Sequence, residues 1–133
     1  MKRSSMAPRK STIELTQKAA FAAIEKLGTD LVAIDLSSQM VLNEVFLLVS
    51  GQNERQIDSI ADEIERALAL VGEKPVRREN SEHWILLDYE DLVVHVQTEE
   101  IRQYYMLDRL WNDCPTIPLD AVREEENFKK GAK

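Results

Sequence analysis

Residues 83–113 contain two short apolar segments that flank a polar turn, and this run constrains the fold more than any other part of the chain. The first segment is Trp84–Leu87 and the second is Leu92–Val96, with the acidic tip Asp88–Asp91 between them. Short aliphatic and aromatic segments on either side of turn-forming residues are typical of a β-hairpin. The sequence therefore predicts two antiparallel strands joined by an acidic turn.

A helix with several aromatic side chains is predicted directly after the hairpin. Thr98 suits the N-cap position, and the two acidic residues that follow it are favoured by the helix dipole. Tyr104, Tyr105 and Trp111 lie within the next turns. Aromatic side chains with polar tips are enriched where two protein surfaces meet. The hairpin and this helix are therefore the first candidates for a partner-binding surface.

Further strands are predicted from two apolar runs and one edge segment. Leu31–Leu36 and Val45–Ser50 are the apolar runs, and Pro75–Arg78 is the edge segment, because proline is tolerated at the start of an edge strand. Val45–Ser50 is apolar at nearly every position. A strand that is apolar on both faces is usually covered by helices on both sides. The expected fold class is therefore α/β, with helices on both faces of a sheet.

Two longer helices are predicted before the hairpin. The first begins at a capping box, Ser11–Glu14, and ends at Gly28. The second follows Asn53, whose side chain is expected to cap it, and ends at Gly72. Its apolar residues recur at the i, i+3, i+4, i+7 spacing of an amphipathic helix. This stripe consists of Ile57, Ile60, Ala61, Ile64, Ala67, Leu68 and Val71.

Length and charge indicate one acidic domain with two charged ends. Residues 1–10 are basic and are expected to be disordered, residues 11–116 form the domain, and residues 117–133 form a charged tail. The domain carries nine basic and twenty acidic residues, a formal net charge of −11. Such a domain binds nucleic-acid phosphates poorly but suits a basic protein surface. The plainer interpretation of the acidity is solubility alone.

Other sequence features favour a cytoplasmic protein. The chain has a single cysteine, Cys114, which excludes an internal disulfide and fits a reducing compartment. No apolar run is long enough to span a membrane, and the first ten residues lack the apolar segment of a secretory signal. We therefore expect no membrane association.

Catalysis is the main alternative to binding. Asp35, Asp88 and Asp91 could form a metal site near His95, but metal-assisted phosphoryl transfer needs carboxylates that converge, and acids beside a tight turn are commonly turn formers. His95 lies among valines in a strand and is expected to be structural, with a contact at an interface as the alternative. Ser50–Gly51 before a helix could hold an anion, yet no phosphate-loop lysine accompanies it. No catalytic, cofactor-binding or metal-binding residue is therefore assigned.

Four stretches of the chain occur in the order and spacing of a known family. They are Val45–Gly51, Arg55–Asp62, Trp84–Val96 and Glu100–Trp111. From Leu31 to Asp113 the chain therefore resembles the ribosomal silencing factor family, also called the Iojap-related family.

The chain departs from the usual family pattern at two places. Glu44 and Val45 stand where the family usually has Asp and Tyr, and Glu90 stands where it usually has glycine. A left-handed turn would cost about 1 kcal/mol with glutamate. A different turn is therefore expected at the hairpin tip.

The resemblance implies a fold, a function and a set of partners. The implied fold is a mixed sheet flanked by helices on both faces, similar to nucleotidyltransferases but without their catalytic acids. The implied function is translational repression: a homodimeric protein binds a basic protein of the large ribosomal subunit, large-subunit protein fourteen, and sterically blocks joining of the small subunit. The resemblance places Trp84, Asp88 and Tyr89 in the partner surface.

The residues themselves extend this surface and leave other interpretations open. Asp91 is expected to add charge attraction, and Tyr89 is expected to be exposed because it lies at the turn. Trp84 opens a strand, so its indole is expected on the sheet surface, although burial in the core is the alternative. A metal-dependent nucleotidyltransferase-like enzyme and a generic dimeric adaptor, in which the aromatic residues serve only the dimer, remain alternatives to a ribosome-binding repressor.

Overall fold

A mixed β-sheet forms the middle layer of the molecule, and the structure, a computed structural model, describes residues 7–39 and 41–119. The elements are α1 (Lys10–Glu25), β1 (Thr29–Asp35), β2 (Val45–Gly51), α2 (Glu54–Ala69), β3 (Arg77–Asn80), β4 (Trp84–Asp88), β5 (Leu92–Thr98), α3 (Glu99–Tyr105) and α4 (Leu107–Leu110). Within the described residues the sheet has five strands in the order β1-β2-β5-β4-β3. β2 and β5 are parallel, and the other neighbouring pairs are antiparallel. The predicted hairpin is β4 and β5.

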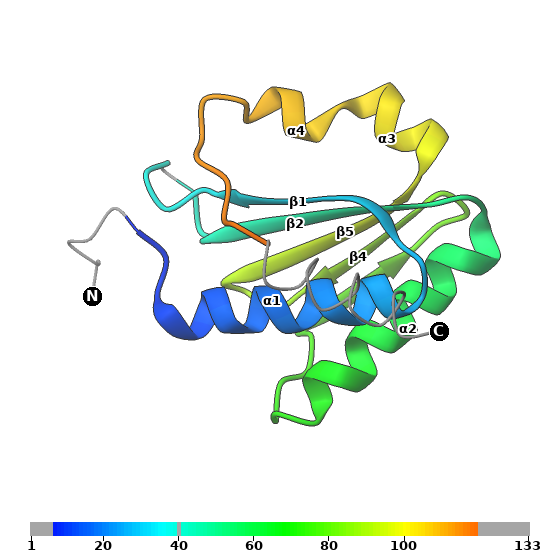
Figure 1. Ribbon diagram of the computed structural model, residues 1–133, viewed down its shortest axis with the longest axis horizontal. Coiled ribbons are helices and arrows are strands. Elements are labelled where there is room, and N and C mark those ends of the chain that lie inside the picture. The colour runs from blue at the N-terminus through cyan, green and yellow to red at the C-terminus, as the bar shows by residue number, and fades with distance from the viewer. Residues whose placement is uncertain (1–6, 40, 120–133) are drawn as a thin grey trace, which may run out of the picture.

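Helices cover both faces of the sheet, as the apolar strands predict. α1 and α2 lie on one face, here called the inner face, and α3 and α4 lie on the other, the outer face (Figure 1). Every residue of β5 is buried, and β2 is buried at all positions except Phe46, which is half-buried. Burial on both faces needs cover on both sides. The predicted α/β fold class is therefore confirmed.

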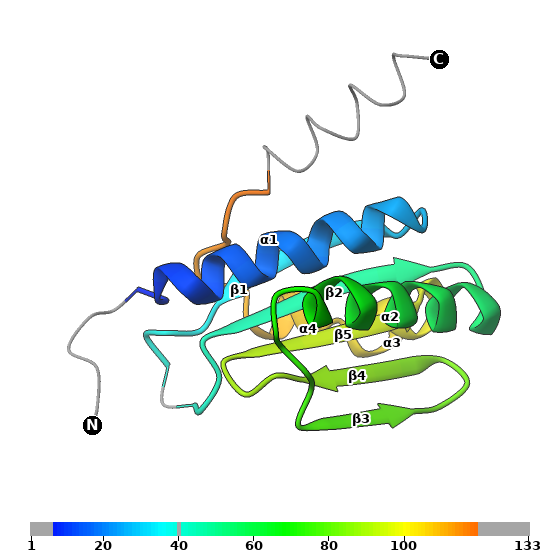
Figure 2. The ribbon, with the colours of Figure 1, turned by 90° about the horizontal axis from the view of Figure 1, so that it is seen from below.

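The inner face carries the main core, where α1 and α2 lie side by side on the sheet (Figure 2). The apolar stripe of α2 packs into this core, except that the helix ends at Ala69 and the predicted stripe residue Val71 is exposed. Asn53 caps α2 as predicted: its side-chain oxygen accepts a hydrogen bond from the Gln56 amide at 2.9 Å. Gly72, at φ +85°, follows the end of this helix, in the left-handed region that favours glycine. The fully buried residues of the inner layer include Leu47, Val49, Ile57, Ile60, Ile64, Leu68, Ile85, Leu87, Leu92, Val94 and Val96.

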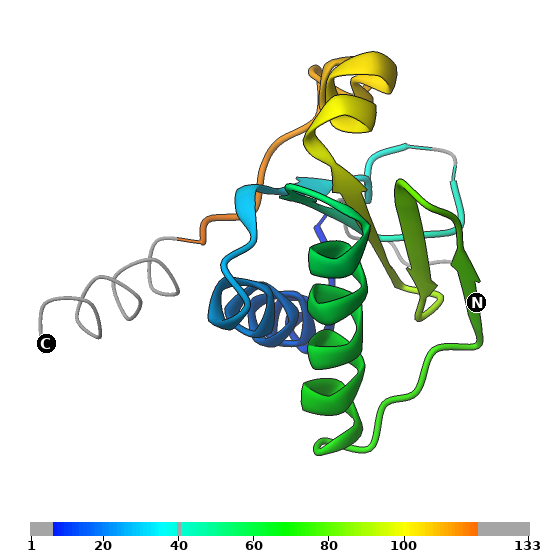
Figure 3. The same ribbon diagram turned by 90° about the vertical axis from the view of Figure 1, so that its right-hand side faces the viewer.

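The outer face has a smaller core that leaves part of the sheet open. Leu36, Leu48 and Ile34 are buried there, and Leu107 and Trp111 pack against them from the segment that contains α4. Figure 3 shows α3 and α4 over one side of the sheet, while β4 and β3 extend beyond them. The predicted last helix is therefore two short helices, separated by Met106 at φ 53°.

The start of α1 differs from the sequence prediction. Ser11 is not the N-cap, because the helix already includes Lys10 and the cap residue is Arg9, which makes no side-chain cap hydrogen bond. A carboxylate distant in the sequence takes this role: Glu44 accepts a hydrogen bond from the Arg9 amide at 3.0 Å. A capping box is a local pattern, and here a long-range partner satisfies the helix start instead.

The end of α1 also departs from the prediction. Leu27, at φ 65°, takes the left-handed conformation that was expected of Gly28. A Cβ atom on Gly28 would lie 2.7 Å from a methyl carbon of Val49. Glycine is therefore needed there for close approach of the chain to β2 and not for the helix stop.

The packed part of the chain extends past both predicted domain boundaries. Ile117 and Leu119 are buried in the inner core, so the domain does not end at residue 116. The Ile117 amide donates to the Ala33 carbonyl at 2.8 Å, which lines this segment along the edge of β1. Arg9, placed by the sequence in a disordered end, makes long-range contacts. Residues 1–6 and 120–133, the rest of the two predicted ends, lie outside the described residues.

Candidate partner-binding surface

The open part of the outer sheet face presents one row of side chains from β4. Trp84, Leu86 and Asp88 alternate along the strand and are half-buried, whereas the residues between them are fully buried. Arg77 is paired with Asp88 across β3 and β4, and Glu79 is paired with Leu86. Because paired residues in an antiparallel sheet lie on the same face, these five residues form one surface, called here the hairpin face.

The hairpin face carries paired charges at the tip end. Arg77 Nη1 lies 2.7 Å from Glu79 Oε2, and Arg77 Nη2 lies 3.6 Å from Asp88 Oδ2. Exposed pairs of this kind contribute little to stability. Two carboxylates against one guanidinium leave the hairpin face with a net negative charge, which is complementary to a basic partner.

Aromatic rings surround Trp84 at the other end of the row. Its ring centroid lies 5.1 Å from that of Tyr105 in α3, and Tyr104 follows 5.0 Å from Tyr105 in an edge-to-face arrangement. Tyr104 is 76% exposed and Tyr105 is 52% exposed. The predicted placement of Trp84 on the sheet surface is confirmed. The result is an aromatic platform, Trp84, Tyr104 and Tyr105, built from β4 and α3.

His95 supports this platform from β5. The Trp84 indole Nε1–H donates to His95 Nδ1 at 3.2 Å, and the imidazole packs edge-on against Phe46 with ring centroids 4.7 Å apart. The expected structural role of His95 is therefore confirmed. Its Nε2 atom is buried and has no hydrogen-bond partner among the described residues. Burial lowers the pKa of His95 to about 4.

This pKa makes the fold sensitive to mild acid. Between about pH 6.5 and about pH 4 the unfolded chain binds a proton at His95 that the folded chain does not bind, so stability falls as the pH falls through this window. We expect the free energy of unfolding to drop by about 2 kcal/mol between pH 7 and pH 5. Urea denaturation followed by circular dichroism at several pH values measures this change.

The matched variant is His95→Asn, which keeps a hydrogen-bond acceptor for the Trp84 indole but does not titrate. Measurements stay above pH 5, where protonation of ordinary carboxylates contributes little. His95→Asn should be less stable at pH 7 and should lose most of the pH dependence. If the free energy of unfolding changed equally with pH in the two proteins, titratable groups other than His95 would be responsible for the pH dependence.

The structure corrects the placement of Tyr89. This residue is 7% exposed and belongs to the inner core, because the alternation that buries Ile85 and Leu87 continues through it. Burial raises the pKa of the Tyr89 phenol, with Glu65 adding to the shift. The hydroxyl has no hydrogen-bond partner within residues 7–39 and 41–119. The expectation that Tyr89 is exposed at the turn was therefore wrong.

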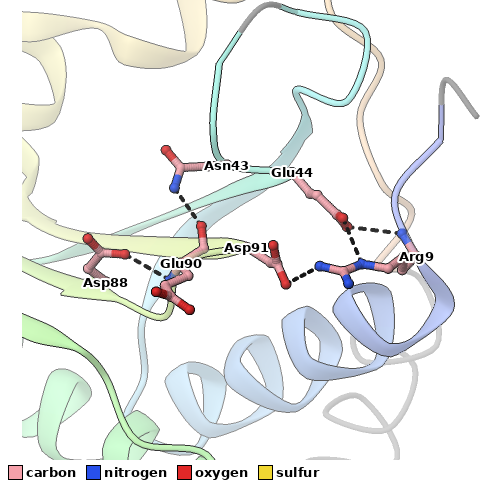
Figure 4. Close-up of polar contacts among 6 residues, drawn as sticks. All are labelled: Arg9, Asn43, Glu44, Asp88, Glu90 and Asp91. Atoms are coloured by element: carbon pink, nitrogen blue, oxygen red, sulfur yellow. Dashed lines mark hydrogen bonds and ion pairs between the residues drawn. The ribbon is translucent and has the colours of Figure 1, made fainter. Parts of the chain in front are cut away.

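Asp91 is engaged within the chain. Its carboxylate forms an ion pair with the Arg9 guanidinium (Figure 4). Its carbonyl accepts hydrogen bonds from the Glu44 and Val45 amides at 2.8 and 3.0 Å. Its charge is thus offset by a neighbouring arginine. Among the predicted site residues, Trp84 and Asp88 share one face, whereas Tyr89 lies on the other face and Asp91 is held at the tip.

The hairpin tip keeps the left-handed backbone that glycine favours. Glu90 has φ 73°, so the expectation of a different turn was wrong. Its amide donates to Asp88 Oδ1 at 2.8 Å, and its carbonyl accepts from Asn43 Nδ2 at 2.6 Å. These two bonds hold a conformation that is otherwise unfavourable for a residue with a side chain.

Relief of this backbone strain is expected to stabilise the fold. Glu90→Gly should raise the free energy of unfolding by up to about 1 kcal/mol, because glycine adopts positive φ without steric cost. Chemical denaturation of the two proteins measures the difference. Glu82→Gly, also an exposed glutamate but without a positive φ, is the control and should not stabilise. Loss of stability in Glu90→Gly would show that the Glu90 side chain supports the tip.

The residues considered for catalysis make other contacts in the structure. Asp35 Oδ1 accepts from the Ser37 amide at 2.9 Å, and Asp88 and Asp91 are bonded as described above. Among the described residues no group of three or more His, Cys, Asp or Glu side chains could hold a metal ion. The helix start after Ser50–Gly51 is occupied by the Asn53 cap. In the same residues no helix has the length and hydrophobicity needed to span a membrane.

Three members of the surface were not singled out by sequence reasoning. Arg77 and Glu79 join it only through the register of β3 against β4, whereas Leu86 joins it through the alternation along β4. The alternation Trp84, Leu86, Asp88 is a signal that could have identified Leu86. The strand expected at Pro75–Arg78 lies two residues further along, so its cross-strand partners could not be assigned.

Comparison with known proteins identifies the family. A family model described as ribosomal silencing factor during starvation matches residues 9–133. A ribosomal silencing factor RsfS from Halalkalibacterium halodurans is 35% identical over 114 residues, covering 84% of this chain and 97% of that protein. The chloroplastic protein Iojap of Zea mays is 27% identical over 112 residues, covering 79% of this chain and 47% of that protein.

Solved structures agree with this result. A crystal structure of a protein from Chromobacterium violaceum matches with a TM-score of 0.71 and 30% identity, covering 74% of this chain and 84% of that one. A crystal structure of a protein from Bacillus halodurans matches with a TM-score of 0.69 and 35% identity, covering 80% and 98%. The family model spans nearly the whole chain, and the solved structures share the fold of this chain. This chain therefore belongs to the family of ribosomal silencing factors.

Proposed function

We propose that this protein represses translation by binding the large ribosomal subunit through a basic ribosomal protein, large-subunit protein fourteen, and so sterically prevents the small subunit from joining. The observation that carries the proposal is the hairpin face with its aromatic platform. A half-buried tryptophan next to two exposed tyrosines is the kind of anchor that dominates protein interfaces. Membership of the silencing-factor family supports a ribosomal partner.

The four predicted partner-binding residues take different roles in this proposal. Trp84 and Asp88 contact the partner directly, since both lie on the hairpin face. Tyr89 acts from the core by fixing the end of β4 against the inner layer. Asp91 acts by holding the tip in place. The acidic domain attracts the basic partner over a longer range.

The proposal includes a cytoplasmic homodimer. Met106 and Leu110 are exposed apolar side chains in the segment of α3 and α4. This surface is available to a second copy of the chain, and burial of apolar area stabilises association. Light scattering should then give about twice the chain mass of 15.3 kDa. A monomer at micromolar concentration would remove the dimer from the proposal.

A subunit-joining assay tests the proposed mechanism. Purified large subunits are incubated with this protein, small subunits are added, and light scattering follows formation of joined ribosomes. We expect the joined fraction to fall as the protein saturates the large subunits. If the protein is instead incubated with the small subunits before the large subunits are added, the joined fraction should fall no further. Normal joining by large subunits that demonstrably carry the protein would contradict the steric mechanism.

A further inference from the structure

Three segments that are distant in the sequence meet at the hairpin tip. Arg9 precedes α1, Asn43 and Glu44 precede β2, and Glu90 and Asp91 form the turn between β4 and β5. Figure 4 shows the polar contacts among them. The contacts run from Arg9 to Glu44 and Asp91, and from Asn43 to the Glu90 carbonyl. No single local motif explains this arrangement.

Glu44 is the buried centre of the cluster. It is 5% exposed, and its carboxylate accepts from the Arg9 amide at 3.0 Å and from Arg9 Nε at 2.9 Å. A buried carboxylate is stable only when such partners satisfy it. Burial opposes ionisation, but hydrogen bonds from the Arg9 amide, Thr12 and the Arg9 guanidinium outweigh it and lower the pKa of Glu44. Glu44 is therefore ionised and needs its arginine.

Arg9 joins this buried acid to the hairpin tip. While Nε contacts Glu44, the Nη2 atom of the same guanidinium pairs with Asp91. A planar guanidinium can serve two carboxylates at once in a fixed geometry, whereas a lysine ammonium is a single point charge. The Glu44 and Val45 amides donate hydrogen bonds to the Asp91 carbonyl. The tip is thus fixed both through Arg9 and through the start of β2.

We infer that Arg9 is a positioning residue for the partner-binding surface: by bridging Glu44 and Asp91 it fixes the tip and the end of β4, so that Asp88 is presented on the hairpin face. This inference rests on the proposed function. A fixed surface binds more tightly because less conformational freedom is lost on association. Arg9 itself does not touch the partner in this arrangement.

The direction of the change in binding affinity distinguishes a positioning role of Arg9 from a simple effect of its charge. Loss of any basic residue makes the chain more acidic, which should leave binding to a basic partner unchanged or strengthen it. Lys10→Ala, one position along, is the matched control for charge. Arg9→Ala removes the same charge but should weaken binding to large subunits about tenfold, because the tip is no longer held.

The experiment measures affinity and tip mobility in the same variants. Purified large subunits are titrated with wild type, Arg9→Ala, Arg9→Lys, Asp91→Asn and the double variant Arg9→Ala/Asp91→Asn. Amide hydrogen exchange by NMR follows the Glu44, Val45 and Asp91 amides in each free protein. We expect faster exchange at these amides in Arg9→Ala than in wild type. The loss of affinity for large subunits should be smaller in Arg9→Lys than in Arg9→Ala. The double variant should bind large subunits no more weakly than Arg9→Ala. That non-additivity is the signature of one shared contact.

Each outcome decides a distinct point. If Arg9→Ala exchanges and binds like wild type, or follows Lys10→Ala in affinity, the positioning role is wrong. Arg9→Lys keeps the charge and serves as the second variant if the alanine protein fails to fold. If wild type does not bind large subunits at all, the proposed function fails, and the exchange data alone then decide whether Arg9 holds the tip.

Discussion

Trp84→Ala is expected to weaken binding to the large ribosomal subunit at least tenfold while the protein stays folded. Truncation of a central interface tryptophan typically costs about 2–4 kcal/mol of binding free energy, and 1.4 kcal/mol corresponds to a factor of ten. The fold should survive because Trp84 is only half-buried and lies outside the inner core. Co-sedimentation or titration with purified large subunits measures the change.

Two other variants make this result specific. Trp84→Phe keeps a ring against Tyr105 but loses the hydrogen bond to His95, so an intermediate loss is expected. Leu70→Ala removes an exposed apolar side chain at the end of α2 and should bind like wild type. Circular dichroism first establishes that each protein is folded. Wild-type affinity in folded Trp84→Ala would show that the partner binds elsewhere.

Charge variants on the same surface should have smaller, salt-dependent effects. Asp88→Asn removes an acid from the hairpin face, and its effect should shrink as salt rises, because exposed charges are screened over about 8–10 Å. Asp58→Asn removes an exposed acid from α2 and is the matched control. Equal losses in the two variants would indicate attraction by the whole acidic domain and not by the hairpin face.

Tyr89→Ala is expected to destabilise the fold by about 3–5 kcal/mol, the usual range for truncating a large buried aromatic side chain. The ring is in the inner core, so its loss leaves a cavity. Tyr89→Phe should instead be neutral or stabilising by about 1 kcal/mol, because the hydroxyl is buried without a partner in the described part of the chain. Urea denaturation of both variants measures these changes.

The binding data for Tyr89→Phe then separate core from interface. The phenylalanine variant should bind large subunits like wild type, since the ring is retained. A weakened affinity with unchanged stability would place the hydroxyl in contact with the partner, and so would return Tyr89 to the partner surface that the sequence predicted.

Elements set by local patterns could be predicted from the sequence. The apolar segments around the acidic turn gave β4 and β5, and the Asn53 cap with its periodic stripe gave α2. In each case the residues that determine the element lie within it or directly beside it in the sequence. Trp84 belongs with these, since its position at the start of a strand favoured the sheet surface over the alternative of burial in the core.

Features that depend on distant partners could not be predicted. The start of α1 is satisfied by Glu44, which is 35 positions from Arg9 in the sequence, and no local pattern marks that pairing. Glu90 tolerates a left-handed backbone only because Asn43 and Asp88 bond its peptide groups. Tyr89 follows the alternation of β4 into the core, but turn residues are ordinarily exposed, and that expectation was given more weight.

Titration of the isolated basic ribosomal protein tests the central claim most directly. Purified large-subunit protein fourteen is titrated with this chain by isothermal calorimetry, alongside Trp84→Ala and Leu70→Ala. The expected result is a saturable complex with one partner per chain, at least tenfold weaker in Trp84→Ala and unchanged in Leu70→Ala. Absence of binding to the isolated protein and to intact large subunits, by a chain shown to be folded, would contradict the claim.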